Sequence, residues 1–165
     1  MFKDELLENK RRREIFVAVD ANPGFHLRRL QRVLNMPLTT LHYHLSYMAR
    51  KKVIFAESEG HQKKYYTKRM DVEDKRILSA LRQKRMRHIV LIVLAKKKTK
   101  HKVLAEHLKL PRSTLSFYLK HLVDKNILTR EKIGHENVYI LRDQDRVKKV
   151  LAAYKPSFKD RPTKT

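Results

Sequence analysis

Cysteine is absent from this sequence, glycine is rare, and long apolar runs do not occur. The lack of cysteine excludes disulfides, thiolate metal sites and a cysteine nucleophile. The longest apolar run, residues 89–95, is too short to cross a membrane as a helix. The N-terminus is charged from Lys3 onward, which does not fit a secretion signal. We therefore expect a cytoplasmic protein that is not attached to a membrane.

Acidic residues are scarce relative to basic ones. Seventeen Asp and Glu stand against 40 Lys and Arg, which gives a formal net charge of +23. Both halves share the excess, because residues 1–70 hold 15 basic and seven acidic side chains and residues 71–165 hold 25 and ten. Such a balance predicts a polyanionic partner. Apolar residues still make up 41% of the chain, enough for packed domains rather than a disordered polycation.

The sequence consists of two related copies. MPLTTLHYHL at residues 36–45 aligns with LPRSTLSFYL at residues 110–119, an offset of 74 residues. This offset holds without a gap from residue 13 to residue 65 of the first copy. A gapless register of this length indicates one supersecondary unit that is used twice.

Apolar spacing and turn residues predict the same elements in each copy. In the first copy we expect helices at about 3–21, 27–34 and 37–51, a short strand at 25–26, hairpin strands at 53–59 and 63–67, and a closing helix at 71–82. In the second copy we expect helices at about 84–95, 101–108 and 112–125, a basic loop at 96–100, strands at 127–132 and 137–141, and a closing helix at 143–153.

Helices followed by a β-hairpin, with a short turn between the second and third helices, form the winged helix-turn-helix arrangement. The predicted fold class is therefore mainly α with small β-hairpin wings (α+β), built as two tandem winged helix-turn-helix domains. We expect the first domain at 1–82, the second at 83–155, and a frayed tail at 156–165.

The third helix of each copy has a polar outer face opposite an apolar inner face. In a major groove, Arg or Lys can donate to guanine, Ser and Thr can pair with several base edges, and aromatic rings can contact a thymine methyl group or a sugar. A polar outer face is also what a merely solvated helix shows, so the repetition, the hairpins and the charge decide between the two interpretations. We predict as base-reading Thr39, Thr40, His42, Tyr43 and Ser46 in the first copy and Arg112, Ser113, Ser116, Phe117 and Lys120 in the second.

Further basic residues fall on helix starts, loops and hairpins, where they would meet phosphates if the third helix entered a groove. Each neutralised phosphate adds about 0.9 to the slope of log affinity against log salt concentration. The basic run at 10–13 is the one that a solvated face explains most readily. The predicted phosphate contacts are Arg28, Arg29, Lys63, Lys64, Lys97, Lys98, Lys100, Lys102 and Lys132.

The sequence offers no convincing catalytic or metal site. It has no glycine-rich phosphate loop, no Ser/His/Asp set that fits one cleft, and no clear carboxylate pair. His42 and His44 would point about 200° apart on a helix, so they cannot share an ion. We expect His44 to pack in the core, and His61 and His135 to serve the hairpin turns or touch a phosphate. We predict no enzyme activity, no cofactor and no bound metal.

STLSFYLKHL at residues 113–122, followed by DKNIL, and TTLHYHL at residues 39–45 resemble the recognition helix of ArsR/MarR-type winged-helix regulators. Two such units in one short chain resemble archaeal tandem winged-helix regulators, a group that includes the euryarchaeal archaellum regulator. The resemblance implies promoter binding. The base-reading positions that it implies are Thr39, His42 and Tyr43 in the first copy and Arg112, Ser113, Ser116 and Phe117 in the second. The chain departs from the family in lacking the metal-sensing cysteines and in having Lys109 at the usual small turn residue.

The predicted function is that of a sequence-specific regulator of transcription that binds double-stranded promoter DNA. The basal transcription machinery is a further expected partner. The chain would act as a monomer with two unequal halves, on a non-palindromic site, or as a homodimer joined through the helices near 71–82 and 143–153. The alternatives are an architectural or chromatin-type DNA binder without sequence preference, and a winged-helix adaptor that binds proteins of the transcription machinery.

Overall fold

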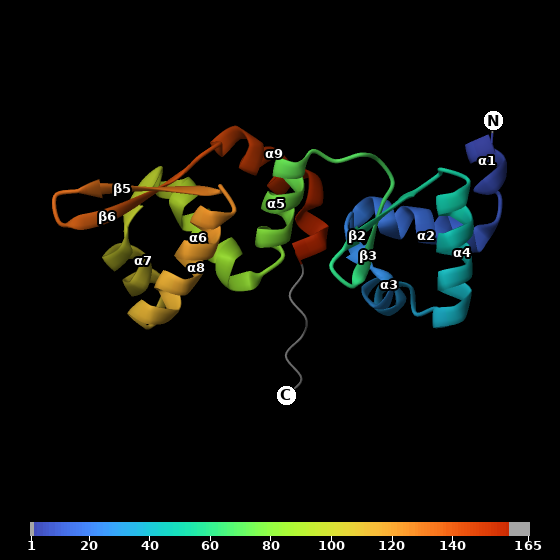
Figure 1. Cartoon of the computed structure of the whole chain (residues 1–165), viewed down its shortest axis with the longest axis horizontal. Coiled ribbons are helices and arrows are strands. Elements are labelled where there is room, and N and C mark those ends of the chain that lie inside the picture. The colour runs from blue at the N-terminus through green and yellow to red at the C-terminus, as the bar shows by residue number, and fades with distance from the viewer. Residues whose placement is uncertain (1, 159–165) are drawn as a thin grey trace. The chain divides into compact units, whose positions relative to one another are not determined.

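The structure is a computed structural model that describes residues 2–158 and divides into two compact units (Figure 1). Unit 1 ends at Asp71, and unit 2 begins at Val72. The sequence predicted a domain boundary after residue 82, so the structure assigns the helix that follows Asp71 to the other unit. The physical reason is that this helix buries its apolar face within unit 2.

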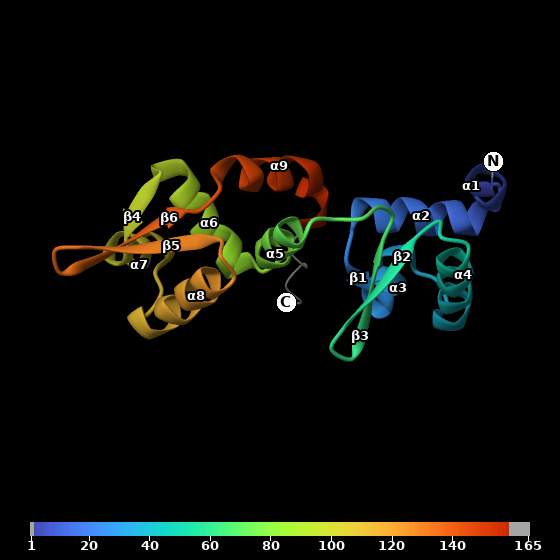
Figure 2. The same cartoon turned by 45° about the horizontal axis from the view of Figure 1, so that its top comes forward.

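Unit 1 has the expected order of helices and hairpin strands. Its three strands form one antiparallel sheet in the order β1-β3-β2, and Figure 2 shows the β2–β3 hairpin extending from the helices. The elements are α1 (Phe2–Leu6), α2 (Lys10–Ala21), β1 (Phe25–His26), α3 (Leu27–Leu34), α4 (Leu38–Arg50), β2 (Phe55–Glu59) and β3 (Gln62–Tyr66).

The prediction of a single long helix at 3–21 is wrong, because the helix is interrupted between α1 and α2. Asn9 stands at the break with an extended backbone, and its side-chain oxygen accepts a hydrogen bond from the Arg12 N–H at 3.2 Å. This is an N-cap, which satisfies one of the backbone donors that a new helix leaves unpaired. The apolar spacing continues across the break, which is why periodicity alone did not reveal it.

Unit 2 repeats this order between two additional helices. Its sheet has the matching strand order β4-β6-β5, and the β5–β6 hairpin projects from the helices in Figure 1. The elements are α5 (Val72–Leu81), α6 (Lys84–Lys96), β4 (Lys98–Lys100), α7 (His101–Leu108), α8 (Arg112–Asp124), β5 (Leu128–Ile133), β6 (Glu136–Leu141), α9 (Gln144–Tyr154) and the 3-10 helix η1 (Lys155–Phe158).

Two expectations for unit 2 are corrected. The basic segment predicted as a loop at 96–100 contains β4, because Thr99 is buried and pairs in register with Tyr139 of β6. The tail predicted to fray from residue 156 is ordered at its beginning. Ser157 is buried in η1 and accepts hydrogen bonds from the Arg82 guanidinium at 3.1 and 3.2 Å. The rest of that tail, 159–165, lies outside the described residues.

The repetition extends to individual backbone conformations. The turn between the second and third helices has a left-handed residue in both units, Asn35 at φ 48° and Lys109 at φ 51°. The turn after the third helix has another, Lys52 at φ 57° and Asn126 at φ 58°. The two units therefore share a backbone even where their side chains differ.

The two cores are built from the same positions. Each buries an inner face of its third helix against the first two helices, and these residues have at most 1% of their surface exposed. Shortening such a side chain to alanine costs about 2–5 kcal/mol of stability. The matched core residues are Ile15, Leu30, Leu41 and Leu45 in unit 1 and Ile89, Leu104, Leu115 and Leu119 in unit 2.

Helices α5 and α9 pack against each other within unit 2. Ile77, Leu78 and Leu81 of α5 are buried, as are Val147 and Val150 of α9. The homodimer was one of the two forms considered, and the apolar faces on which it would form are covered within one chain. Among the described residues, none of the helices is both long enough and apolar enough to cross a membrane.

Candidate nucleic-acid interface

The third helices, α4 and α8, separate cleanly into buried and exposed faces. The inner residues Leu41, Leu45 and Met48 are fully buried, and so are their counterparts in α8. The predicted base-reading residues lie on the opposite side, as the helical period required. Thr39, His42, Tyr43, Arg112, Ser113, Ser116, Phe117 and Lys120 are exposed, while Thr40 and Ser46 are half-buried.

Large aromatic side chains are exposed at one repeated position of the outer faces. Tyr43 has 57% of its surface exposed and Phe117 has 59%. Each ring contacts another ring one turn further along its helix. Tyr43 stacks on Tyr47 with ring centroids 6.4 Å apart, and Phe117 meets His121 at 4.6 Å. Rings held in this way present flat apolar surface to a partner at low entropic cost.

Tyr47 and His121 belong to this surface although neither was among the predicted base-reading residues. Their spacing of four residues from Tyr43 and Phe117 was the available signal, because such residues are neighbours on a helix. Tyr47 also carries the Arg12 guanidinium 4.3 Å above its ring. Arg12, in the basic run at 10–13, therefore has a structural role. This agrees with our leaving that run out of the predicted phosphate contacts.

A hydrogen bond joins the second and third helices of unit 2 at the outer face. Nε2 of His101, the first residue of α7, lies 3.0 Å from Oγ of Ser116. Burial lowers the pKa of His101, the nearby Arg112 guanidinium lowers it further, and a hydrogen bond with the Arg112 backbone acts in the opposite direction. The neutral imidazole is thus favoured near neutral pH. Nothing in the sequence analysis singled out His101.

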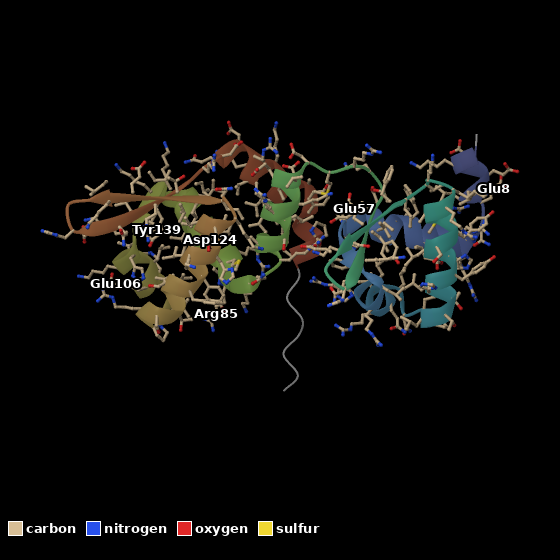
Figure 3. The ribbon with its side chains drawn as sticks, in the orientation of Figure 1. Glu8, Glu57, Arg85, Glu106, Asp124 and Tyr139 are labelled. Carbon is tan, nitrogen blue, oxygen red and sulfur yellow. The ribbon has the colours of Figure 1, made fainter. Side chains whose placement is uncertain are left out.

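The predicted phosphate contacts fall into two groups. Figure 3 shows nitrogen-tipped side chains distributed over both units. Arg28, Lys63, Lys97, Lys98, Lys102 and Lys132 are exposed. Three others take part in contacts within the chain, since Arg29 covers the Phe25 ring, Lys64 pairs with Glu59, and Lys100 pairs with Glu136.

These internal pairs do not exclude a role in binding. Exposed ion pairs are worth about 0–1 kcal/mol, so a phosphate can replace the carboxylate as the partner. The same holds for Lys120 on the outer face of α8, whose Nζ lies 3.7 Å from the Asp124 carboxylate. Asp124 is labelled in Figure 3.

The two hairpins differ in chemistry at their tips. Both turn at a glycine with positive φ, Gly60 at 59° and Gly134 at 63°, and a side chain there would be strained. Before the glycine, unit 1 has Glu59, whereas unit 2 has Ile133 with 54% of its surface exposed. Lys63, Lys64 and Lys132 led us to expect phosphate contacts from both wings. Only the wing of unit 2 combines a cation, Lys132, with an apolar tip.

His44 packs in the core of unit 1, as predicted. It is 8% exposed, and its ring meets Tyr43 edge-on at 5.2 Å. Its buried Nδ1 has no hydrogen-bond partner among residues 2–158. Burial lowers the pKa of His44, and Arg12 and Arg11 lower it further. Within the same residues, no group of three or more His, Asp or Glu is arranged to hold a metal ion.

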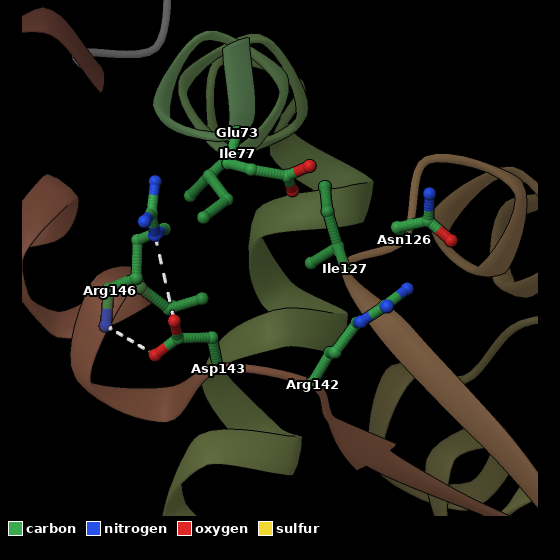
Figure 4. A pocket seen from close by; sticks show the side chains of 8 residues that line it. Glu73, Ile77, Asn126, Ile127, Arg142, Asp143 and Arg146 are labelled. Carbon is green, nitrogen blue, oxygen red and sulfur yellow. Dashed lines mark hydrogen bonds and ion pairs between the residues drawn. The ribbon is translucent and has the colours of Figure 1, made fainter. Parts of the chain in front are cut away.

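A hollow of about 270 Å³ opens in unit 2 where α5 and α9 approach the turn between α8 and β5 (Figure 4). Ile77 and Val147 contribute apolar lining. Arg146 at its rim lies 3.3 Å from Asp74 and 3.5 Å from Asp143, and the Asp143 side chain also caps α9. The Arg146–Asp74 pair joins α9 to α5, whereas the Arg146–Asp143 pair lies within the first turn of α9, so the rim charges serve the packing of unit 2.

Comparison with known families gives two partial matches. Residues 9–78 match a family model described as an N-terminal HTH domain. Residues 70–143 match a model described as the C-terminal domain of SoFic-like protein adenylyltransferases. The two matches fall on the two repeated segments in turn.

Individual relatives are also similar to parts of the chain. An uncharacterized HTH-type transcriptional regulator of Methanocaldococcus jannaschii is 30% identical over 141 residues, which cover 86% of this chain and 36% of that protein. The chain thus spans about a third of the length of this relative.

Two solved structures resemble about half of the chain. HlyU from Vibrio cholerae aligns with 18% identity and a TM-score of 0.45, covering 53% of this chain and 94% of that one. The transcriptional repressor PagR of Bacillus anthracis aligns with 24% identity and a TM-score of 0.44, covering 48% and 91%. The helix order and hairpin wings give both units the winged helix-turn-helix fold, and residues 9–78 are similar to an N-terminal HTH domain.

Proposed function

We propose that the chain is a sequence-specific, double-stranded DNA-binding regulator of transcription. The observation that carries the proposal is the contrast between the two faces of α4 and α8. Their buried faces repeat, whereas their exposed faces differ at His42 and Ser116, at Tyr43 and Phe117, and at Ser46 and Lys120. Packing explains the shared face but does not require a particular outer face, so the differences are available for reading two different DNA sequences.

In this mode α4 and α8 each enter a major groove and the wings lie on the adjacent backbone or minor groove. The exposed hydroxyls of Thr39 and Ser113 permit close approach to base edges. Arg112 would donate to guanine, and the rings of Tyr43 and Phe117 would lie against thymine methyl groups or sugars. The exposed lysines before and within α7 would contact phosphates. The net charge of +23 supports binding to a polyanion.

The proposed binding form is a single chain with two unequal readers. Support comes from α5 and α9, whose apolar faces are buried against each other. A dimer would therefore need another surface. Promoter DNA is the proposed target, with the chain associated with the chromosome in the cytoplasm, and the basal transcription machinery is a further proposed partner. The similarity to the regulator from M. jannaschii supports this class of function.

The finer family assignments stay predictions. These are the ArsR/MarR-like subtype, an archaeal source and a role in archaellum regulation. We also propose that the chain acts by binding alone, without catalysis. Because one match concerns a domain of adenylyltransferases, incubation with radiolabelled ATP and mixed protein substrates tests this point. We expect no label transfer, and labelled protein would contradict non-catalytic action.

Selection of bound duplexes from random DNA by the purified chain tests the proposed function. We expect a motif with two non-identical parts. In competition at physiological salt, its affinity should exceed that for random DNA by roughly 10³-fold or more. Uniform affinity for all sequences would favour an architectural binder, and failure to bind DNA would favour the protein-binding adaptor.

A charge variant shows whether α8 is the reading element. Ser116→Glu places a negative charge on the outer face of α8 and should weaken specific binding at least tenfold. Ala152→Glu introduces the same charge at an exposed position of α9, away from α8 in sequence, and serves as the matched control. Equal binding by the wild-type chain and Ser116→Glu would contradict the proposal.

A further inference from the structure

The two copies of the repeat depart from each other at two positions that touch in unit 2. The first residue of the second helix is Leu27 in unit 1 and His101 in unit 2. On the outer face of the third helix, His42 in unit 1 corresponds to Ser116 in unit 2. His101 and Ser116 are the pair joined by the 3.0 Å hydrogen bond. Unit 1 thus has an imidazole at this place on its third helix, whereas unit 2 has a short hydroxyl there and an imidazole on the helix before it.

The contact matters because a serine hydroxyl alone is a poor reader. Its hydroxyl rotates freely and can act as donor or acceptor, so it pairs with several base edges. A fixed neighbour that occupies one of its hydrogen-bonding sites restricts the remaining ones. The half-buried ring of His101, held at the start of α7, is such a neighbour.

We propose that His101 is a specificity-determining residue of unit 2, which positions Ser116 and limits it to one hydrogen-bonding role toward a base. This inference rests on the proposed function, since it assumes that the outer face of α8 reads DNA. His101 itself acts through Ser116 and is a positioning residue.

The two roles differ in the bases that they select. If Nε2 of the neutral ring accepts the Ser116 hydroxyl proton, the Oγ lone pairs face the groove and select the amino group of adenine or cytosine. If Nε2 carries a proton and donates, the hydroxyl proton of Ser116 and one Oγ lone pair both stay available, so Ser116 can still meet either a donor or an acceptor on a base. The first arrangement is therefore the one that limits Ser116 to a single role, and in it the histidine excludes bases that offer only acceptors in the major groove.

In unit 1 the residue equivalent to His101 is Leu27, so the second helix offers no imidazole to the third helix. Leu27 has no polar atom in its side chain, and the exposed His42 is long enough to reach a base edge by itself. His101→Leu therefore gives unit 2 the residue that unit 1 has at the equivalent position, Leu27. The variant is expected to fold, which thermal unfolding checks.

The experiment measures the base preference of the full chain at each position of its selected DNA site. Ser116→Ala identifies the base pair that Ser116 reads. His101→Leu should reduce discrimination at that same base pair by about fivefold, the loss expected for one hydrogen bond. His101→Gln, whose amide can reach Ser116, should restore much of it. His107→Leu is the matched control, because that histidine is exposed on the same helix and its Nδ1 lies 3.0 Å from the Val103 carbonyl oxygen of that helix.

The double variant decides between positioning and an independent effect. If His101 acts through Ser116, the His101→Leu/Ser116→Ala chain should discriminate no worse than Ser116→Ala alone. Additive losses, a loss at a different base pair, or unchanged preference in His101→Leu would each overturn the inference while leaving sequence-specific binding intact. If His101→Leu does not fold, His101→Asn, which is polar but too short, takes its place. A wild-type chain that selects no motif would overturn the proposed function itself.

Discussion

At the level of single residues, the two units differ in the conformational free energy of a residue in the left-handed conformation. A left-handed conformation is unfavourable by about 1–2 kcal/mol for most residues, and asparagine tolerates it better. Unit 1 has Asn35 in the turn before its third helix, whereas unit 2 has Lys109 in the same conformation. In the sequence, Lys109 stands where the resembling family has a small turn residue.

Lys109→Asn should therefore raise the free energy of unfolding of unit 2 by about 0.5–1 kcal/mol. Chemical denaturation of the full chain measures the change. The reciprocal variant Asn35→Lys is the control and should destabilise unit 1 by a similar amount. A lower stability for Lys109→Asn would show that the lysine makes a favourable contact that outweighs the strain.

The buried histidine of unit 1 predicts a pH dependence of stability. The pKa of His44 in the folded chain lies below its ordinary value of 6.5, chiefly because of burial. As the pH falls below about 6.5, the unfolded chain takes up the proton more readily than the folded one. The free energy of unfolding should consequently decrease on acidification until the lowered pKa is passed.

His44→Tyr introduces the residue found at this position in unit 2, Tyr118, and removes this contribution. Stability measured between about pH 7.5 and 5 should fall less in the variant than in the wild type. A residual decrease is expected, because the pKa values of His26 and His101 are also lowered. An identical pH profile in both chains would contradict the assignment.

At the level of secondary-structure elements, the N-cap of α2 has a measurable role. The Asn9 side chain accepts the Arg12 N–H where the chain restarts its helix. Asn9→Ala should lower the stability of unit 1 by about 1 kcal/mol, whereas Asn9→Asp should retain it, since aspartate caps equally well. Thermal unfolding compares the three chains. Equal loss in both variants would mean that the amide, rather than the cap, is required.

The helical faces were the most predictable elements. A period of 3.6 residues determined which side of α4 and α8 is buried, and the structure confirms the division at Leu41, Leu45 and their counterparts. Contacts that depend on tertiary placement were missed. The sequence did not reveal the break at Asn9 or the pairing of β4 with β6. It also did not reveal that His101 touches Ser116, because 15 residues and a turn separate them.

At the level of the whole molecule, charge predicts a steep salt dependence of DNA binding. Six to ten phosphate contacts would give a slope of log affinity against log salt of about −5 to −9. Lys98→Ala should make this slope shallower by about 0.9 and leave base preference unchanged. Ser116→Ala should instead alter the base preference at one base pair and leave the slope of log affinity against log salt unchanged. A change of preference in Lys98→Ala would place that lysine among the base readers.

The central claim is that the outer faces of α4 and α8 read different DNA sequences. It is tested most directly by the triple variant His42→Ser, Tyr43→Phe and Ser46→Lys, which gives α4 three of the outer residues of α8. Site selection with this chain should recover a motif in which the part read by unit 1 has changed toward the part read by unit 2. Recovery of the wild-type motif by the variant would contradict the claim.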